Sequence, residues 1–147
     1  MLPFASKYLT RTNDRKYPEP KKHLLVVDDD LAIRTVLHAI LKKEFQVTTV
    51  DSGYAALAWL TNGNVPDLII SDISMPDISG FGLLKALSQS GLYNTIPVII
   101  VSGHDHEEVE SYHALYGNLK ACLTKPFNPA LLKNRINAVL DEELQVC

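Results

Sequence analysis

Cysteine is scarce in this 147-residue sequence, which contains only Cys122 and Cys147. Two cysteines are too few for a disulfide framework, and they do not form the CxxC spacing of metal and redox sites. Because low cysteine use is typical of reducing compartments, we expect a cytoplasmic location. The sequence also lacks the run of roughly 20 apolar residues that a membrane-spanning helix needs, and its first residues lack the apolar core of a secretory signal. We therefore expect neither membrane insertion nor export.

A net positive charge is absent as well, because 14 Lys and Arg residues stand against 17 Asp and Glu residues. Such a chain offers no overall attraction to nucleic-acid phosphates, so we expect no direct nucleic-acid binding. The basic residues concentrate early: residues 1–22 hold six basic and two acidic side chains, and the remainder holds eight and fifteen. Because Pro3, Pro18 and Pro20 oppose a helix there, residues 1–22 are predicted to be a flexible basic extension.

What the sequence does contain is a regular alternation of short apolar runs with longer segments of helical period. This alternation is typical of parallel strands joined by crossover helices. The predicted strands are Leu24–Val27, Gln46–Val50, Asp67–Ser71, Pro97–Val101 and Ala121–Thr124. The predicted helices follow Asp30, cover Tyr54–Leu60 and Gly80–Leu87, begin near Asp105, and run from Pro129 to Leu140. The pattern predicts an α/β protein with a doubly wound, five-stranded parallel sheet and five helices.

Several helix boundaries carry capping signals. Asp30 precedes an apolar stripe of helical period and is predicted to be the N-cap of that helix. The stripe consists of Ile33, Val36, Leu37, Ile40 and Leu41. Asp105 and Glu108 have the spacing of a capping box, and Asn128 followed by Pro129 marks the start of the last helix.

Polar residues follow four of the five predicted strands directly. They are Asp28 and Asp29 after the first strand, Asp72 after the third, Ser102 after the fourth and Lys125 after the fifth. The carboxyl ends of parallel strands meet at one edge of a doubly wound sheet, where such folds keep their sites. The sequence therefore predicts that three carboxylates, one hydroxyl and one ammonium group lie together.

Three carboxylates in one cleft repel one another and must either take up a proton or bind a cation. Mg²⁺ suits the cluster because this ion prefers oxygen ligands and keeps positions for phosphate oxygens. With a phosphoryl group held there, an aspartate could attack phosphorus while Lys125 and Ser102 contact the other phosphoryl oxygens. The predicted chemistry is the transfer of a phosphoryl group onto a carboxylate.

Four segments, LLVVDDD, PDLIISDISMPDISG, PVIIVSG and LTKPF, resemble the receiver domain of two-component response regulators. The resemblance covers residues 23–143, which leaves residues 144–147 as a tail. It implies a CheY-like, flavodoxin-type sheet with the strand order 2-1-3-4-5. It also implies a phosphoryl donor that is a histidine kinase or a phosphotransfer protein, and an output surface on the fourth helix, the fifth strand and the fifth helix.

The resemblance also implies a role for each residue of the cluster. Asp72 would be the phosphoacceptor, and Asp29, Asp72 and the backbone carbonyl of Ser74 would bind Mg²⁺ directly. Asp28 would act on the metal through water. Ser102 would supply the hydroxyl that moves toward the phosphoryl group. Lys125 would form an ion pair with the aspartyl phosphate.

Family likeness further implies a cis peptide bond between Lys125 and Pro126, a geometry that X-Pro bonds adopt at little cost. The sequence departs from the family pattern at Cys122, where an aromatic residue is usual, and at Ser79, where Asp is common before Gly80. Serine at position 79 can still cap the third predicted helix. Cys122 and Cys147 are interpreted as inert thiols, and Tyr112 and Tyr116 as packing residues.

The positions that tune dephosphorylation in the family carry Ser74 and His104 here, and neither is a carboxylate or a carboxamide. We therefore expect slow autodephosphorylation.

Three alternatives to phosphoacceptance differ in class. A phosphatase of the haloacid dehalogenase type also uses an aspartyl phosphate and Mg²⁺, but Leu31 stands where Thr or Val is usual after the DxD spacing of Asp28–Asp30. A pseudo-receiver would bind partners without phosphorylation, and Cys122 is its support. A flavodoxin-type carrier is disfavoured because three acids would repel the flavin phosphate.

Only Asp141–Cys147 follow the last predicted helix. We therefore expect a single-domain receiver that is not a turnover enzyme and that signals through another molecule.

Overall fold

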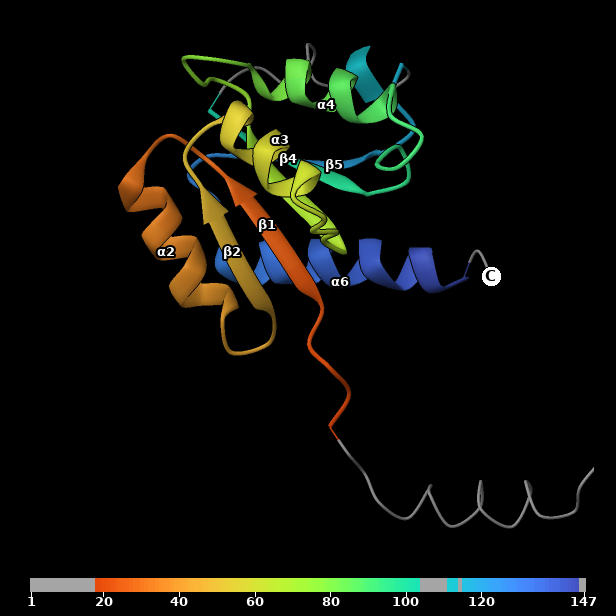
Figure 1. The fold of residues 1–147 in the computed structure, drawn as a ribbon. Coiled ribbons are helices and arrows are strands. Elements are labelled where there is room, and N and C mark those ends of the chain that lie inside the picture. The colour runs from red at the N-terminus through yellow and green to blue at the C-terminus, as the bar shows by residue number, and fades with distance from the viewer. Residues whose placement is uncertain (1–17, 104–110, 114, 146–147) are drawn as a thin grey trace, which may run out of the picture.

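Five parallel strands form one sheet in the order β2-β1-β3-β4-β5, as the sequence and its family likeness predict. The computed structural model describes residues 18–103, 111–113 and 115–145. The strands are β1 (His23–Val27), β2 (Gln46–Val50), β3 (Leu68–Asp72), β4 (Val98–Ser102) and β5 (Leu119–Thr124). Figure 1 shows the sheet between two layers of helices.

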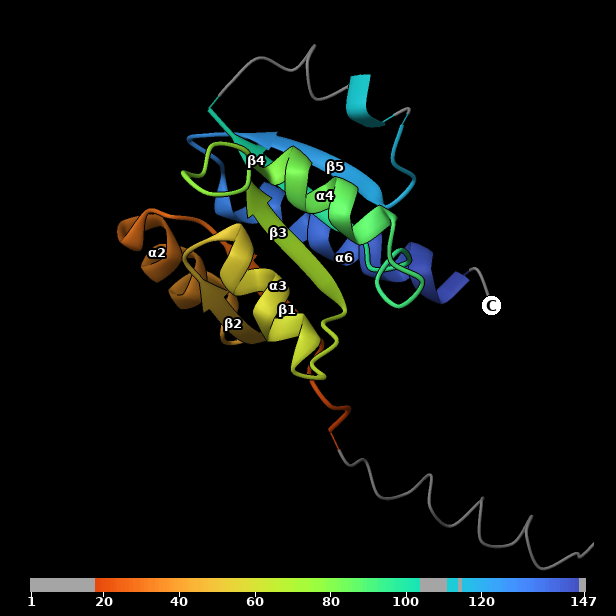
Figure 2. The same ribbon diagram turned by 45° about the horizontal axis from the view of Figure 1, so that its top comes forward.

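The helices divide between the two faces of the sheet, as Figures 1 and 2 show. Their bounds are α2 (Leu31–Leu41), α3 (Gly53–Thr61), α4 (Gly80–Ser88) and α6 (Pro129–Gln145). Buried side chains of α2 and α6 share one apolar cluster, and those of α3 and α4 share the other. This is the doubly wound arrangement that the alternating pattern predicts.

Strand β1 is buried on both of its faces. Leu24 and Val26 belong to the cluster beneath α2 and α6, whereas Leu25 and Val27 belong to the cluster beneath α3 and α4. All four are at most 1% exposed. A continuous apolar run therefore forms the centre of the molecule, and the polar residues that follow it emerge at one edge of the sheet.

Side-chain caps fix the starts of four helices. The side-chain oxygens of Asp30, Ser52 and Ser79 accept hydrogen bonds from backbone N–H groups of α2, α3 and α4. Asn128 Oδ1 accepts from the N–H of Ala130 at 2.8 Å, at the start of α6. The predicted caps at Asp30, Ser79 and Asn128 are thus confirmed. Each satisfies N–H groups that have no partner within the helix.

The prediction that Val36 belongs to the buried stripe of α2 is wrong, because this side chain is 48% exposed. Leu37 and Leu41 are buried at 2% and 0%, and Ile33 and Ile40 pack against the same cluster. Val36 lies at the edge of the helix face that these residues define, where the helix turns away from the sheet.

Two element boundaries differ from the predictions at the carboxyl-terminal side. Strand β5 begins at Leu119, two residues earlier than predicted, and a register shift between Val98 and Ile99 leaves Lys120 unpaired with β4. Helix α6 continues to Gln145, so residues 144 and 145 of the predicted tail are helical. No proline or glycine interrupts residues 141–145, and Glu, Leu and Gln favour helix.

The predicted fourth helix lies mostly outside the described residues, and its capping box of Asp105 and Glu108 lies entirely outside them. Residues 111–113 are helical. No helix of the described segments is long and apolar enough to span a bilayer.

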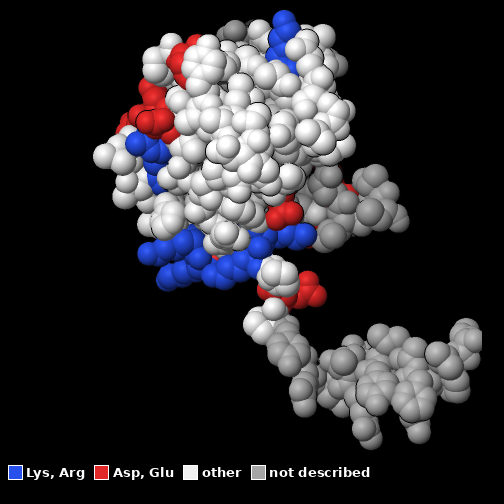
Figure 3. Space-filling view, in the orientation of Figure 1, with Lys and Arg blue, Asp and Glu red and all other residues white. Residues whose placement is uncertain are grey.

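Charge is distributed unevenly between the two ends of the sheet. Figure 3 shows Lys and Arg side chains gathered where α2 ends and acidic side chains where β1 leads into α2. At the basic end, Lys21 Nζ donates to the carbonyl oxygen of Lys42 at 3.3 Å, and Lys133 Nζ pairs with Glu44 at 3.2 Å. The predicted site lies at the opposite end, where acidic residues predominate.

Candidate functional site

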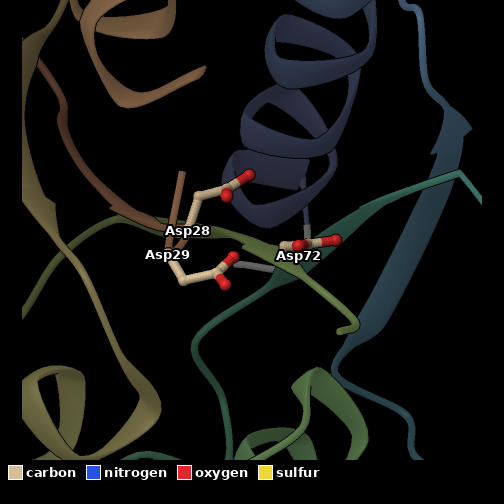
Figure 4. A group of neighbouring side chains, drawn as sticks. All are labelled: Asp28, Asp29 and Asp72. Atoms are coloured by element: carbon tan, nitrogen blue, oxygen red, sulfur yellow. The ribbon is translucent and has the colours of Figure 1, made fainter. Parts of the chain in front are cut away.

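Three carboxylates meet at the carboxyl edge of the sheet. Asp28 and Asp29 follow β1, and Asp72 is the last residue of β3. One oxygen from each lies within 4.8 Å of one from each of the others. Figure 4 shows Asp28 and Asp29 extending from the end of β1 toward Asp72. Asp28 and Asp72 are buried, at 3% and 9% exposed, whereas Asp29 is open to solvent. The predicted acidic cluster is confirmed, and it could hold a cation from the solvent side.

Lys125 joins this cluster from the end of β5. Its Nζ lies 2.9 Å from Asp28 Oδ2 and 3.5 Å from Asp72 Oδ1. The N–H of Lys125 donates to the carbonyl oxygen of Ser102 at 2.8 Å, which ties the ends of β4 and β5 together. The Lys125–Pro126 peptide bond is cis, as predicted. One ammonium group therefore lies beside two of the three carboxylates.

The pKa of Asp72 is raised above the ordinary value of 3.8. Burial is the main cause, because it penalises the charged form, and the negative charge of Asp28 adds to it. The Lys125 charge and the N–H of Ile73, which donates to Asp72 Oδ1 at 2.8 Å, offset part of this effect. A single ammonium group thus leaves the site short of positive charge, and a divalent cation fits the oxygen donors present.

Lys125 remains protonated despite its burial. Desolvation lowers the pKa of this ammonium group, but the hydrogen bond with Asp28 and the negative charges of Asp28 and Asp72 outweigh that effect. The net result is a pKa above 10.5. Lys125 is therefore a fixed positive charge throughout the physiological pH range.

Backbone contacts hold Asp28 in place. Its Oδ1 accepts the N–H of Asp30 at 2.9 Å, and its own N–H donates to the carbonyl oxygen of Val50 at 3.2 Å. Arg34 Nη1 donates to the carbonyl oxygen of Asp28 at 2.7 Å. Arg34 was not predicted to have a role, and nothing in its spacing from Asp28 would indicate one. The contact fixes the turn that presents Asp28 and Asp29.

A sequence profile of the response regulator receiver domain matches residues 24–137. The chain belongs to the response regulator receiver domain family. This receiver domain is 36% identical over 124 residues to the two-component response regulator ORR3 of Oryza sativa. The aligned region covers 84% of this chain and 94% of ORR3. It is 33% identical over 140 residues to the 3',5'-cyclic-nucleotide phosphodiesterase regA of Dictyostelium discoideum, of which it covers 18%.

Solved structures show the same fold. The chemotaxis protein CheY4 of Vibrio cholerae superposes on the receiver domain with a TM-score of 0.74 and 30% identity, over 81% of this chain and 98% of CheY4. A putative response regulator from Chloroflexus aurantiacus gives a TM-score of 0.76 at 30% identity, over 84% and 99%. The predicted family and the predicted strand order are both confirmed. The match favours neither the phosphatase nor the flavodoxin-type carrier.

Ser102 and Ser74 occupy different environments in the receiver domain. Asp72 pairs in register with Val101, so Ser102 lies one residue beyond that partner, and it is 1% exposed. Ser74 is exposed, two residues after Asp72. The metal contact of the Ser74 carbonyl and the movement of the Ser102 hydroxyl stay predictions. His104 lies outside the described residues.

Gly80 contributes to the site in a way that sequence reasoning missed. A Cβ atom at this position would overlap the carbonyl oxygen of Asp72 and lie 2.9 Å from Ile73 Cα. The N–H of Gly80 donates to the carbonyl oxygen of Ile73 at 2.8 Å. Only glycine therefore allows the start of α4 to pack directly against the backbone that carries Asp72.

Cys122 lies on the α3 and α4 side of the sheet, packed against the same cluster as Tyr112 and Tyr116. Burial raises the pKa of its thiol, which disfavours the reactive thiolate, so an inert Cys122 stays a prediction that this burial supports. The rings of Phe81 and Tyr112 stack with centroids 3.8 Å apart. Tyr112 and Tyr116 are thus packing residues, as predicted.

Proposed function

We propose that this receiver domain accepts a phosphoryl group on Asp72 in a Mg²⁺-dependent reaction and signals by changing a protein-binding surface. The observation that carries the proposal is the convergence of the Asp28, Asp29 and Asp72 carboxylates within 4.8 Å. Lys125 Nζ, 2.9 Å from Asp28 and 3.5 Å from Asp72, adds a fixed cation to the same space. Carboxylates accompanied by one ammonium group can accommodate a dianionic phosphoryl group only when further positive charge, such as a metal ion, offsets the repulsion between the negative charges.

Asp29, Asp72 and the carbonyl oxygen of Ser74 would hold Mg²⁺, with Asp28 contributing through water. When bound, the ion supplies positive charge that offsets the charge of the transferring phosphoryl group. Its presence would also favour the ionised form of Asp72, which burial disfavours. The carboxylate is then available as the nucleophile.

In the proposed step an Asp72 carboxylate oxygen attacks the phosphorus atom of a phosphohistidine on the donor. The new P–O bond forms as the P–N bond breaks, and the released imidazole nitrogen keeps the bonding pair and takes a proton from solvent. Lys125 would turn from Asp28 to the phosphoryl oxygens. The Ser102 hydroxyl would move toward another of these oxygens. Because the product of this step is the phosphorylated protein itself, which loses the group only by slow hydrolysis, the domain is a stoichiometric acceptor and not a turnover enzyme.

Receiver domains work with histidine kinases or phosphotransfer proteins, and we propose one of these as the donor. The proposed output surface consists of the helical residues 111–113, β5 and α6. We further propose that residues 23–143 act as a single signalling domain that follows an amino-terminal extension, residues 1–22. A cytoplasmic location stays a prediction from the low cysteine content.

Incubation with acetyl phosphate and MgCl₂, followed by intact-protein mass spectrometry, tests the proposal. We expect the wild-type chain to gain one phosphoryl group, and Asp72→Asn, or the wild type with EDTA, to gain none. A folded wild type that binds Mg²⁺ and gains mass from neither acetyl phosphate nor a phosphorylated phosphotransfer protein would contradict the proposal. In that case the pseudo-receiver, which binds partners without phosphorylation, would become the better interpretation.

A further inference from the structure

The loop of residues 73–79 joins Asp72 to α4 and carries Ser74, whose carbonyl oxygen is the proposed third metal ligand. Ser74 itself is exposed, so packing of its side chain does not hold its backbone in place. A backbone ligand binds tightly only when the chain around it is held in the binding geometry. The contacts of the loop with its neighbours therefore bear directly on the metal site.

Asp77 attaches this loop to the amino terminus of α3. Its Oδ2 accepts the N–H of Tyr54 at 2.9 Å, and its Oδ1 accepts the N–H of Gly53 at 3.3 Å. These N–H groups belong to the first turn of α3, where helical partners are missing. The hydrogen bonds, above all that from Tyr54, lower the pKa of Asp77, so its carboxylate stays ionised at neutral pH. Asp77 thus bridges 23 residues of sequence with two charge-assisted hydrogen bonds.

The next residue, Ile78, packs the same part of the loop against two helices. A Cβ atom on Gly53 would lie 2.8 Å from Ile78 Cβ, and one on Gly82 would lie 2.7 Å from Ile78 Cγ2. The Ile78 side chain therefore contacts the starts of α3 and α4 closely. Apolar packing at Ile78 and polar anchoring at Asp77 together hold the loop between Asp72 and α4.

We infer that Asp77 is a positioning residue for the metal site: by anchoring the loop to α3, it sets the place of the Ser74 carbonyl. This inference rests on the proposed function, because it assumes that Ser74 contributes a ligand. Asp77 acts through the backbone and does not itself contact the metal or the phosphoryl group. Its loss weakens Mg²⁺ binding more than the loss of one charge or one helix cap does.

Asp77 also lines an open cleft beside Asp29, so its negative charge could itself favour Mg²⁺ binding. The test must separate this effect of charge from the effect of positioning the loop. The cleft has a volume of about 610 Å³, and its other lining residues are Asp51, Ser52, Tyr54 and Pro76. Asp51 is an exposed carboxylate on the same cleft, and among the described residues it accepts no hydrogen bond from the loop. Asp51→Asn therefore removes the same charge and leaves the anchor in place.

Helix capping must be separated as well, because Asp77 satisfies N–H groups of α3. Ser52 caps the same helix end, where its Oγ accepts the N–H of Ala55 at 3.0 Å. Ser52→Ala is expected to lower the stability of the protein, as the loss of a cap usually does, while the Asp77 contacts remain. This variant is the control for destabilisation of α3 without loss of the loop anchor.

The test is a calorimetric titration of the full-length chain with MgCl₂ in the wild type and four variants, with the folding of each checked by circular dichroism. Asp77→Ala is expected to weaken Mg²⁺ binding about tenfold, the size typical of lost outer-sphere support at metal sites. Asp77→Asn keeps an acceptor oxygen and is expected to retain binding within about threefold, as are Asp51→Asn and Ser52→Ala.

Equal weakening by Asp77→Ala and Asp51→Asn, or by Asp77→Ala and Ser52→Ala, would overturn the inference, as would unchanged binding in Asp77→Ala. If the wild type binds no Mg²⁺, the proposed function fails and the inference fails with it. A wild type that binds Mg²⁺ and accepts phosphate, combined with an Asp77→Ala variant that binds equally well, would overturn the inference alone.

Discussion

Asp72 is the residue on which the proposed chemistry depends, and its burial costs free energy when no cation is bound. The pKa of this carboxyl is raised, so the folded protein holds the proton to a higher pH than the unfolded chain does. Below pH 3.8, the ordinary pKa, this carboxyl is protonated in both the folded and the unfolded protein, so its titration does not change the free energy of unfolding. As the pH rises through the folded-state pKa, ionisation destabilises the native protein.

Asp72→Asn is therefore expected to increase the free energy of unfolding at pH 7 without Mg²⁺, by about 1 kcal/mol. The gain should shrink as the pH falls toward 3.8. Urea denaturation across this pH range measures it, with EDTA present throughout. Asp28→Asn serves as a contrast, because it weakens the 2.9 Å contact with Lys125 and should destabilise the protein. A loss of stability in Asp72→Asn at pH 7 would contradict the expected cost of burial.

Slow autodephosphorylation follows from Ser74 and His104, which provide no carboxylate or carboxamide to orient an attacking water. We expect the phosphorylated form to persist for minutes or longer, measured by the decay of the phosphorylated mass after acetyl phosphate is removed. Introducing an amide, as in Ser74→Asn, should shorten that lifetime. A wild-type half-life of seconds would be inconsistent with this interpretation.

At the scale of elements, the packing of α4 against the end of β3 places the site. Gly80→Ala is expected to destabilise the protein by roughly 1–3 kcal/mol, because the added methyl group meets backbone atoms of Asp72 and Ile73, which cannot move aside like a flexible side chain. Gly91→Ala is the matched control, since no atom lies within 4 Å of the added Cβ there. Chemical denaturation of both variants checks the prediction, and equal stabilities would refute it.

Sequence reasoning placed the elements well because local signals and burial agree. The run Leu24–Val27 is buried on both faces, and Asp30, Ser79 and Asn128 cap their helices as predicted. Residues that end parallel strands necessarily share an edge of the sheet, which is why the acidic cluster was predictable. The ends of helices and strands were less predictable. Leu119, for example, belongs to β5 because it pairs with Val98 across a bulge, and the sequence does not show this pairing.

Contacts between residues far apart in the sequence could not be predicted from it. Asp77 bonds Tyr54 across 23 residues, and the local pattern gives no sign of that pairing. The exposure of Val36 depends on how far α2 turns from the sheet, which periodicity alone does not determine. The sequence indicates Gly80 only as the start of a helix, although the main constraint on this residue is its close approach to the Asp72 carbonyl oxygen.

At the scale of the whole molecule, acidic side chains gather at the end of the sheet that holds the site, with Lys125 among them, and most of the visible Lys and Arg side chains gather at the opposite end (Figure 3). Cation binding should therefore stabilise the fold as a unit. At a Mg²⁺ concentration 100 times the dissociation constant, the free energy of unfolding is expected to rise by about 2.7 kcal/mol. Thermal denaturation with increasing MgCl₂ measures this shift, and Asp72→Asn should reduce it strongly. An equal rise in thermal stability in the wild type and in Asp72→Asn would indicate that Mg²⁺ binds at a site that does not involve Asp72.

The position of the phosphoryl group is the most direct test of the proposed chemistry. The wild-type chain would be phosphorylated with acetyl phosphate and MgCl₂, digested under mildly acidic conditions, and its fragments sequenced by tandem mass spectrometry. We predict a single phosphoryl group on Asp72, removable by hydroxylamine as expected of an acyl phosphate. A stable modification on another residue, or phosphorylation that persists unchanged in Asp72→Asn, would contradict the role assigned to Asp72.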